Sequence, residues 1–246
     1  MNLNCDLGED VDGQGTEHDA QLMPFIDQAN IACGFHAGDA WVASNVLDMA
    51  AKHCVTIGAH PSYPDRKNFG RKSLQLKPQE LIANLHYQIG GLDDLVKGKG
   101  LVLSYVKPHG ALYNDMIIDA DLRYTVMQAI ASYSTDLSLM ILSTSSFAEH
   151  KVEADKLGIK LLAEAFADRC YDDDGHLLSR EHTGAVHDEP AILSQVRQLI
   201  EKGSVLTRSG TELFLAVDSI CMHGDNPAAT NTIARVSEIV RKGLEQ

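Results

Sequence analysis

Seven apolar runs of strand length, separated by stretches with helical periodicity, constrain the fold of this chain more than any other feature. Several runs are rich in Val, Ile and Leu and do not alternate with polar residues, which is typical of strands buried on both faces. We therefore expect a parallel sheet covered by helices. The expected strands lie at residues 2–5, 28–33, 55–59, 101–106, 137–142, 159–163 and 215–222.

Apolar residues between these runs recur every three or four positions, which indicates amphipathic helices. About seven strand–helix units in 246 residues favour a closed or nearly closed barrel over an open sheet. We therefore expect an α/β fold with one domain over residues 1–246, a single TIM-like (β/α)7 barrel. The apolar stripes are Val42, Val46, Met49 and Ala50; Leu81, Leu85, Ile89, Leu92 and Val96; Leu122, Val126 and Ile130; Ile192, Val196 and Leu199; and Ile233, Val236, Val240 and Leu244.

The segment at residues 166–190 departs from the strand–helix alternation. Within it, the sequence Asp173-Asp174-Gly175 is a turn signal of the kind found in β-hairpins. We expect a hairpin inserted between the sixth and seventh barrel strands.

Polar and ionisable residues lie at the end of nearly every expected strand. The C-terminal ends of parallel barrel strands converge on one face, and that face holds the active site. We therefore expect these residues to surround one mouth: Asn4, Asp6 and Glu9 at the first strand; His36 and Asp39 at the second; His60 at the third; Lys107, His109, Tyr113 and Asn114 at the fourth; Glu164, Asp168 and Arg169 at the sixth; His223 and Asp225 at the seventh.

Several of these residues have a simpler structural interpretation. Asp39 stands just before an expected helix, where a carboxylate can cap free backbone N–H groups. Asp225 has the same alternative, although Asn226 before Pro227 is the better cap. Lys107 is also consistent with a solvated loop charge, and His60 with a hydrogen-bonded turn residue. The seven remaining histidines are expected to be structural or exposed.

Composition excludes some classes of function. The net charge is −13 and no Lys/Arg stripe exists, so we expect no nucleic-acid partner. No apolar stretch is long enough to span a bilayer, and the N-terminus lacks the features of a secretory signal, so we expect a cytoplasmic protein without a membrane partner. The five cysteines are odd in number and widely spaced, which argues against a disulfide framework.

Familiar catalytic and nucleotide-binding signatures are absent from the sequence. There is no Gly-x-x-x-x-Gly-Lys-Ser/Thr phosphate loop, no Gly-x-Gly-x-x-Gly fingerprint, no Gly-x-Ser-x-Gly elbow and no His-Glu-x-x-His helix. The chain therefore encodes no nucleotide pocket of a standard type.

Six long blocks of sequence resemble the LamB/YcsF family and occur in the family's order. Two small departures concern Asp10-Val11-Asp12, where the family leads us to expect a Gly-Phe-Gly-like stretch, and Lys72 in place of an arginine; both leave the main blocks untouched. The blocks are NCDLGE (4–9), NIACGFHAGD (30–39), GAHPSYPD (58–65), VKPHGALYN (106–114), EAFADRCY (164–171) and CMHGDNP (221–227).

The resemblance implies a seven-stranded TIM-like barrel related to polysaccharide deacetylases. It also implies a role as the A subunit of an ATP-hydrolysing 5-oxoprolinase, which opens 5-oxo-L-proline to L-glutamate together with two partner subunits, B and C. Because the sequence lacks a phosphate loop, we expect ATP, the cosubstrate, to be bound mainly with those partners. The barrel would then hydrolyse the activated lactam.

Under this hypothesis, each cluster of residues has an expected role. Asp6, His36, Asp39 and His60 surround the attacking water, and one of them is the general base. Lys107 and His109 hold the substrate carboxylate or stabilise developing negative charge. His223 and Asp225 complete the opposite wall. The remaining substrate contacts are Asn4, Glu9, Tyr113, Asn114, Glu164 and Arg169.

Three alternatives stay open at this point. Asp6, His36 and His60 are also a plausible set of ligands for a divalent metal. A stand-alone, metal-dependent deacetylase-like hydrolase would act without ATP or partners, and a non-catalytic carrier would only bind the lactam. The sequence leaves the oligomeric state open, and a homo-oligomer is compatible with it.

Overall fold

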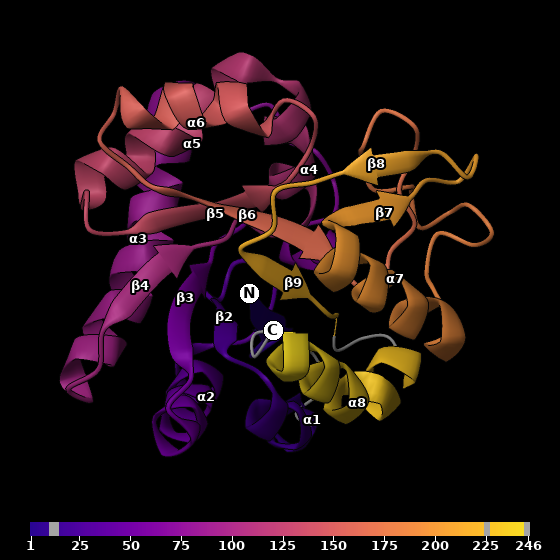
Figure 1. Cartoon of the computed structure of the whole chain (residues 1–246). Coiled ribbons are helices and arrows are strands. Elements are labelled where there is room, and N and C mark those ends of the chain that lie inside the picture. The colour runs from indigo at the N-terminus through magenta and orange to yellow at the C-terminus, as the bar shows by residue number, and fades with distance from the viewer. Residues whose placement is uncertain (10–14, 224–226, 244–246) are drawn as a thin grey trace.

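Seven parallel strands close into a barrel in the computed structural model, which describes residues 1–9, 15–223 and 227–243. Their order around the barrel is β1-β2-β3-β4-β5-β6-β9, so the chain adds each new strand beside the previous one and β9 closes the ring against β1. This confirms the predicted barrel (Figure 1). The strands are β1 Asn2–Leu7, β2 Gln28–Ala32, β3 Thr56–His60, β4 Leu103–Val106, β5 Ser138–Leu142, β6 Leu161–Phe166 and β9 Ser219–Cys221.

Helices surround the barrel, and five of them match the predicted apolar stripes: α2, α3, α5, α7 and α8 (Figure 1). The others, α1, α4 and α6, have weaker stripes. None of the helices in the described part of the chain has both the length and the apolar character needed to cross a membrane. The helices are α1 Gly15–Leu22, α2 Ala40–His53, α3 Pro78–Gly98, α4 Gly110–Ile118, α5 Ala120–Tyr133, α6 Phe147–Asp155, α7 Glu189–Lys202 and α8 Pro227–Gly243, with 3-10 turns at Met23–Phe25 and Arg66–Asn68.

The segment between β6 and β9 contains the predicted turn and one hairpin that the sequence did not indicate. Tyr171 and Leu177 form an isolated antiparallel bridge, and the Asp172 N–H donates to the His176 carbonyl at 2.8 Å, so the chain reverses around Asp173-Asp174-Gly175. A second antiparallel pair, β7 Ser204–Leu206 and β8 Glu212–Phe214, follows α7. The predicted strand at 215–222 is therefore too long, because pairing with β1 and β6 begins only at Ser219.

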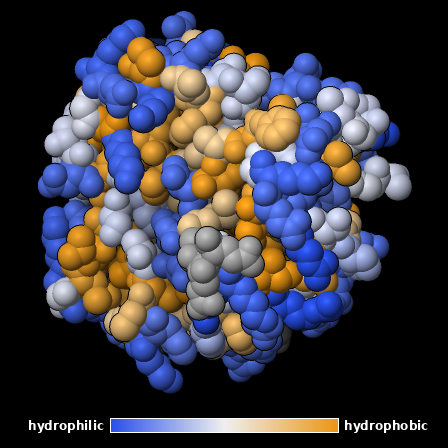
Figure 2. Space-filling view, in the orientation of Figure 1, coloured by the Kyte–Doolittle hydropathy of each residue, from blue (hydrophilic) through white to orange (hydrophobic). Residues whose placement is uncertain are grey.

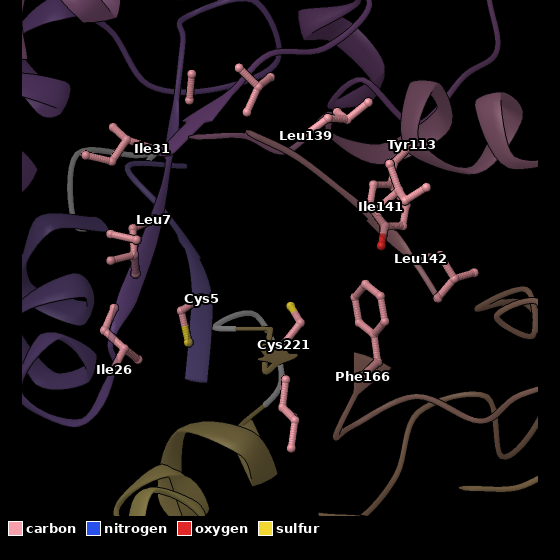
Figure 3. Close-up of a cluster of buried hydrophobic side chains, with 14 of the residues drawn as sticks. Cys5, Leu7, Ile26, Ile31, Tyr113, Leu139, Ile141, Leu142, Phe166 and Cys221 are labelled. Carbon is pink, nitrogen blue, oxygen red and sulfur yellow. The ribbon is translucent and has the colours of Figure 1, made fainter. Parts of the chain in front are cut away.

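The apolar core lies between the barrel and the helices, whereas the barrel interior is polar. Along β1, Leu3, Cys5 and Leu7 belong to the buried apolar cluster, while Asn4 alternates with them and hydrogen bonds to Asn30 of β2. Figure 3 shows Leu7, Ile26 and Ile31 packed together in this cluster. In the orientation of Figure 1, hydrophilic residues cover most of the edge of the molecule (Figure 2). Polar side chains such as Asn4 and Asn30 point into the barrel, where they can support a site.

Gly58 in β3 gives Tyr105 of β4 room to lie across the barrel interior. The two residues are register partners, and a Cβ added at Gly58 would lie 2.2 Å from Cε2 of Tyr105. Tyr105 is fully buried and donates to Asn30 Oδ1 at 2.6 Å, so its ring cannot move aside without losing that hydrogen bond.

We expect Gly58→Ala to destabilise the folded protein by about 1–3 kcal/mol, as overpacked core substitutions do. Gly91→Ala is the matched control, because Gly91 lies in α3 with open space around its Cβ position. That substitution is expected to stabilise the protein by about 0.5–1 kcal/mol. Urea unfolding of both variants measures the difference; equal midpoints would contradict the packing argument.

Candidate active site

The strand ends deliver polar side chains to one cavity of about 360 Å³. Asp6 lies at the end of β1, His60 at the end of β3, and Lys107 directly after β4. Because the strands are parallel and paired in sequence around the barrel, their C-terminal ends meet at one mouth. The cavity is lined by Asp6, Glu9, His60, Arg71, Lys107, Pro108, His109, Gly110, Ala111, Tyr113, Asn114, Phe166, Arg169, Leu177, Ser179, Arg180 and His223.

One wall of the cavity carries a cluster of three imidazoles around the Glu9 carboxylate. Glu9 Oε1 lies 3.0 Å from His109 Nδ1, 3.1 Å from His36 Nε2 and 3.6 Å from His60 Nε2. The His36 ring stacks on the His109 ring with centroids 3.8 Å apart, and the His60 ring meets both edge-on. We call Glu9, His36, His60 and His109 the Glu–His cluster.

Backbone carbonyls fix which nitrogens of this cluster carry protons. The Nδ1 of His60 lies 2.7 Å from the Lys107 carbonyl, and the Nε2 of His109 lies 2.9 Å from the Phe69 carbonyl. A carbonyl oxygen only accepts, so both of these nitrogens donate. In neutral rings, the unprotonated nitrogens are then His60 Nε2 and His109 Nδ1, which lie 2.9 Å apart. Two lone pairs at this distance repel each other unless a proton or a cation lies between them.

The geometry of the Glu–His cluster also fits a metal ion. One nitrogen or oxygen from each of the four residues lies within 4.8 Å of all the others. Imidazoles that bind metals usually donate their second N–H to a carbonyl or carboxylate, as His60 and His109 do here. The Nδ1 of His36 is buried and has no hydrogen-bond partner among the described residues. The four residues could therefore hold a divalent cation.

Lys107 lies buried between two carboxylates at the floor of the cavity. Its Nζ is 2.8 Å from Asp6 Oδ1 and 2.9 Å from Glu164 Oε1, with side-chain exposures of 3%, 8% and 0% for the lysine, Asp6 and Glu164. Although burial alone lowers the pKa of the Lys107 ammonium, Asp6, Cys221 and Glu164 raise it well above its usual value. Lys107 is therefore a permanent cation that neutralises the two acids.

Burial and neighbouring charges set the protonation states of the cluster. Burial lowers the pKa of His36 to about 4, so this ring is neutral at pH 7. Burial alone would raise the pKa of Glu9, but the neighbouring His109 and His36 imidazoles hold it far below its usual value. His60 has a raised pKa despite its burial, because Asp6 Oδ2 lies 3.4 Å from its Nε2. The cluster therefore joins an ionised carboxylate to imidazoles of differing basicity.

The opposite wall carries aromatic, acidic and cationic groups. Tyr113 donates to Glu164 Oε2 at 2.5 Å, and His223 Nδ1 lies 3.2 Å from both oxygens of Asp168. Tyr113 and Phe166 lie close together, as Figure 3 shows. Arg71, Arg169 and Arg180 also line the cavity, and the Arg169 guanidinium donates to the carbonyls of Ala185 at 3.3 Å and Leu178 at 2.6 Å. An anionic ligand would meet these cations on entering.

Most of the residues predicted for the mouth do meet there, but Asn4 and Asp39 lie elsewhere. Asn4 is fully buried in the barrel interior, with its Oδ1 3.4 Å from Lys107 Nζ, so it supports the site from below. Asp39 is exposed and outside the cavity, because its carboxylate accepts from the Val42 N–H at 2.9 Å and caps α2. Asp225 lies outside the described residues. Asp168 is fully buried and lies behind the cavity wall against His223. Those that contribute to the cavity or its cluster are Asp6, Glu9, His36, His60, Lys107, His109, Tyr113, Asn114, Glu164, Arg169 and His223.

Two expected roles need a comment in the light of the contacts. The Lys107 ammonium lines the cavity and contacts Asp6 and Glu164, so its expected role in holding a substrate carboxylate stays a prediction. The expected metal set is divided between two groups: His36 and His60 lie with Glu9 and His109, whereas Asp6 lies with Cys221 and His223 in a separate group that could hold a cation.

Sequence reasoning gave no role to Asp168, Arg71 or Arg180, although all three contribute to the site. Asp168 was expected at the mouth because it follows a barrel strand, but its pairing with His223 could not be foreseen. Arg71 directly precedes Lys72, the departure from the family pattern beside the expected mouth, but it was given no role. Arg180 lies in a loop far from any strand end, and the sequence carried no signal for it.

Comparisons with known proteins agree with this architecture. The model of the LamB/YcsF family matches residues 1–245. The chain is 45% identical over 99% of its length to an A subunit of 5-oxoprolinase from Pseudomonas putida, covering 94% of that protein. It is 46% identical to the A subunit of 5-oxoprolinase from Vibrio cholerae, over 96% of both chains.

A solved structure shows the same fold. The crystal structure of a lactam utilization protein from Thermus thermophilus matches with a TM-score of 0.86 and 33% identity, over 100% of this chain and 96% of that one. A match of this length to the family model, together with relatives of this identity, leaves one conclusion: the chain belongs to the LamB/YcsF family.

Proposed function

We propose that this chain is the A subunit of a 5-oxoprolinase, in which it hydrolyses 5-oxo-L-proline to L-glutamate while ATP is hydrolysed to ADP and phosphate. The names of the relatives from Pseudomonas putida and Vibrio cholerae support the activity, and their designation as one lettered subunit supports partner chains, which we propose to be subunits B and C. The lactam utilization protein of the same fold agrees with a cyclic amide as substrate.

One observation carries this proposal: the cavity joins a water-activating cluster to cationic groups that suit a small anionic substrate. The Glu–His cluster forms one wall, and Arg71, Arg169 and Arg180 line the same cavity. Guanidinium groups recognise carboxylates and phosphates through paired N–H donors. The substrate carboxylate and a phosphate added to the lactam oxygen would both find cations here. A volume of about 360 Å³ is at the small end of ligand cavities, as a five-membered ring requires.

ATP is needed because amide resonance makes an unactivated lactam resistant to water. Phosphorylation of the lactam oxygen makes the carbonyl carbon a better electrophile. Since the sequence contains no phosphate loop, we assign ATP binding mainly to the partner subunits and the opening of the activated ring to this cavity. Tyr113 and Asn114 line the cavity and would contact the substrate, while Asp6, Lys107 and Glu164 hold the floor rigid.

The Glu–His cluster is the proposed site of water activation. His60 and Glu9 are the candidates for general base, since both line the cavity and both contact His109. The cluster also fits a divalent cation, with Glu9, His36, His60 and His109 as the residues that would hold it. Such a cation, when bound, would lower the pKa of a water molecule and polarise the substrate oxygen.

The proposal is tested by measuring 5-oxoproline-dependent release of ADP and glutamate, first with this chain alone and then with the companion subunits added. We expect no release by the chain alone and equal release of both products by the full complex. Amide hydrolysis by the isolated chain without ATP would instead identify a stand-alone deacetylase-like enzyme. Lactam binding without turnover in the complex would identify a carrier.

A further inference from the structure

Asp168 and His223 form a hydrogen-bonded pair on the wall of the cavity. Asp168 follows β6 and His223 follows β9, and these strands are paired neighbours. The Ala167 N–H donates to the Cys221 carbonyl at 2.9 Å, immediately before the two side chains. The pairing of the strands therefore fixes the separation of the carboxylate and the imidazole, which is 3.2 Å from Nδ1 to either oxygen.

The geometry orients the His223 ring and fixes its tautomer. An ionised carboxylate only accepts, so the Nδ1 of His223 carries a hydrogen and Nε2 is the nitrogen left to exchange a proton with a ligand. Among the described residues, the hydrogen bonds of His223 all involve Nδ1. The ring stacks on Phe166 with centroids 5.3 Å apart and lines the cavity, whereas Asp168 is fully buried behind it.

Burial alone would raise the pKa of Asp168, yet His223 holds it below the usual value, so the carboxylate is charged. The charged Asp168 carboxylate accepts the Nδ1 hydrogen of His223, so Nε2 is the position that can carry a transferable proton at the surface of the cavity.

When water has added to a phosphorylated lactam, either of two bonds can break: the C–O bond to the phosphate or the C–N bond of the ring. Phosphorylation of the carbonyl oxygen, with loss of the lactam N–H proton to solvent, leaves a C=N bond in the ring, and one water adds across it, with OH on carbon and H on nitrogen. The resulting tetrahedral carbon carries a hydroxyl, a phosphate oxygen and a neutral ring amine. Phosphate leaves without help and regenerates the lactam, which wastes the ATP. The amine leaves only after it has received a further proton.

We propose that His223, positioned by Asp168, donates that proton to the ring nitrogen and thereby directs the intermediate to ring opening; this inference rests on the proposed 5-oxoprolinase activity. The proton passes from Nε2 to nitrogen, the C–N bond breaks with its electron pair on nitrogen, and the hydroxyl loses its proton to a water molecule as C=O forms. The product is an acyl phosphate with a free amine. A second water hydrolyses it to glutamate and phosphate, and His223 regains a proton from solvent.

The test measures the ratio of ADP to glutamate released by the full complex, reassembled from separately purified subunits. The wild-type ratio is expected to be close to one. In H223Q, the amide can still donate to Asp168 but cannot transfer a proton; in D168N, the carboxylate that orients the His223 ring through Nδ1 is lost. We expect glutamate release to fall by about 100-fold in H223Q and ADP release to fall far less, so the ratio rises by at least about tenfold. D168N is expected to shift the ratio in the same direction, and D168E to recover part of the coupling.

Matched controls are H182Q and D136N, because His182 and Asp136 are exposed and lie outside the cavity lining. Both are expected to keep a ratio close to one. A ratio that stays at one in H223Q and in folded D168N, whether or not turnover falls, would overturn the assignment. A wild-type complex that releases no glutamate would instead remove the proposed function, so the two failures are distinguishable.

Discussion

Replacing Lys107 with methionine is expected to destabilise the protein by about 3–5 kcal/mol, the cost of removing one partner from a buried ion pair. Lys107 lies within 2.9 Å of oxygens of both Asp6 and Glu164, and Glu164 has no exposed side-chain surface. Without the ammonium, two buried carboxylates would face each other across the barrel without compensation. Methionine has nearly the same length, so the loss would come from charge and not from a cavity. Urea unfolding monitored by circular dichroism measures the effect.

Lys99→Met is the control for this prediction. Lys99 forms an ion pair with Asp48 at 2.6 Å, but the Asp48 side chain is 66% exposed. Exposed pairs contribute between about 0 and 1 kcal/mol, so Lys99→Met should leave the unfolding midpoint almost unchanged. Equal stability losses in the two variants would show that Lys107 is not the electrostatic centre of the barrel.

Metal binding by the Glu–His cluster is the second large effect that we expect. Protein purified without chelator should bind about one equivalent of Co²⁺ and develop visible absorption bands, because imidazole nitrogens and a carboxylate converge on one point. His109→Gln should weaken binding by at least about 100-fold, since removing a ligand costs no less than removing a residue that orients one. Calorimetric titration and the visible spectrum both report this loss independently of activity.

The control for metal binding is His176→Gln. His176 forms another candidate group with Asp172 and Asp174, but this group is partly exposed and lies in the turn between β6 and α7. Cobalt bands that survive His109→Gln and vanish in His176→Gln would place the ion in that turn instead. Absence of cobalt binding by the wild-type protein would contradict the metal site. A proton shared between His60 Nε2 and His109 Nδ1 would then separate the two facing lone pairs.

The fold could be predicted from the sequence because each barrel strand is a short apolar run followed by polar residues. His60, Lys107 and His223 could be assigned to one face for the same reason, since parallel strands all end there. Helix α4 could not be predicted, because apolar residues occur on nearly all its sides. The β7–β8 hairpin was hidden by an apolar stretch that continues from it into β9.

Pairings within the site depend on distances that the sequence does not contain. Asp6 and His60 were expected to share a metal, but they fall in separate candidate groups, His60 with Glu9, His36 and His109, and Asp6 with Cys221 and His223. Glu9 was expected only to touch substrate, yet it lies among three imidazoles. For Asp39, the sequence pattern fits both a helix cap and a catalytic acid. Only the hydrogen bond from the Val42 N–H to its carboxylate shows that it is a cap.

The most direct test of the account is glutamate release by the complex that contains His60→Asn in this chain and wild-type companion subunits. His60 lines the cavity, and its Nε2 faces His109, Asp6 and Glu9, so we expect release to fall by about 100-fold or more while the complex still assembles. Wild-type rates of glutamate release from an intact complex with this substitution would contradict the claim that the lactam opens in this cavity.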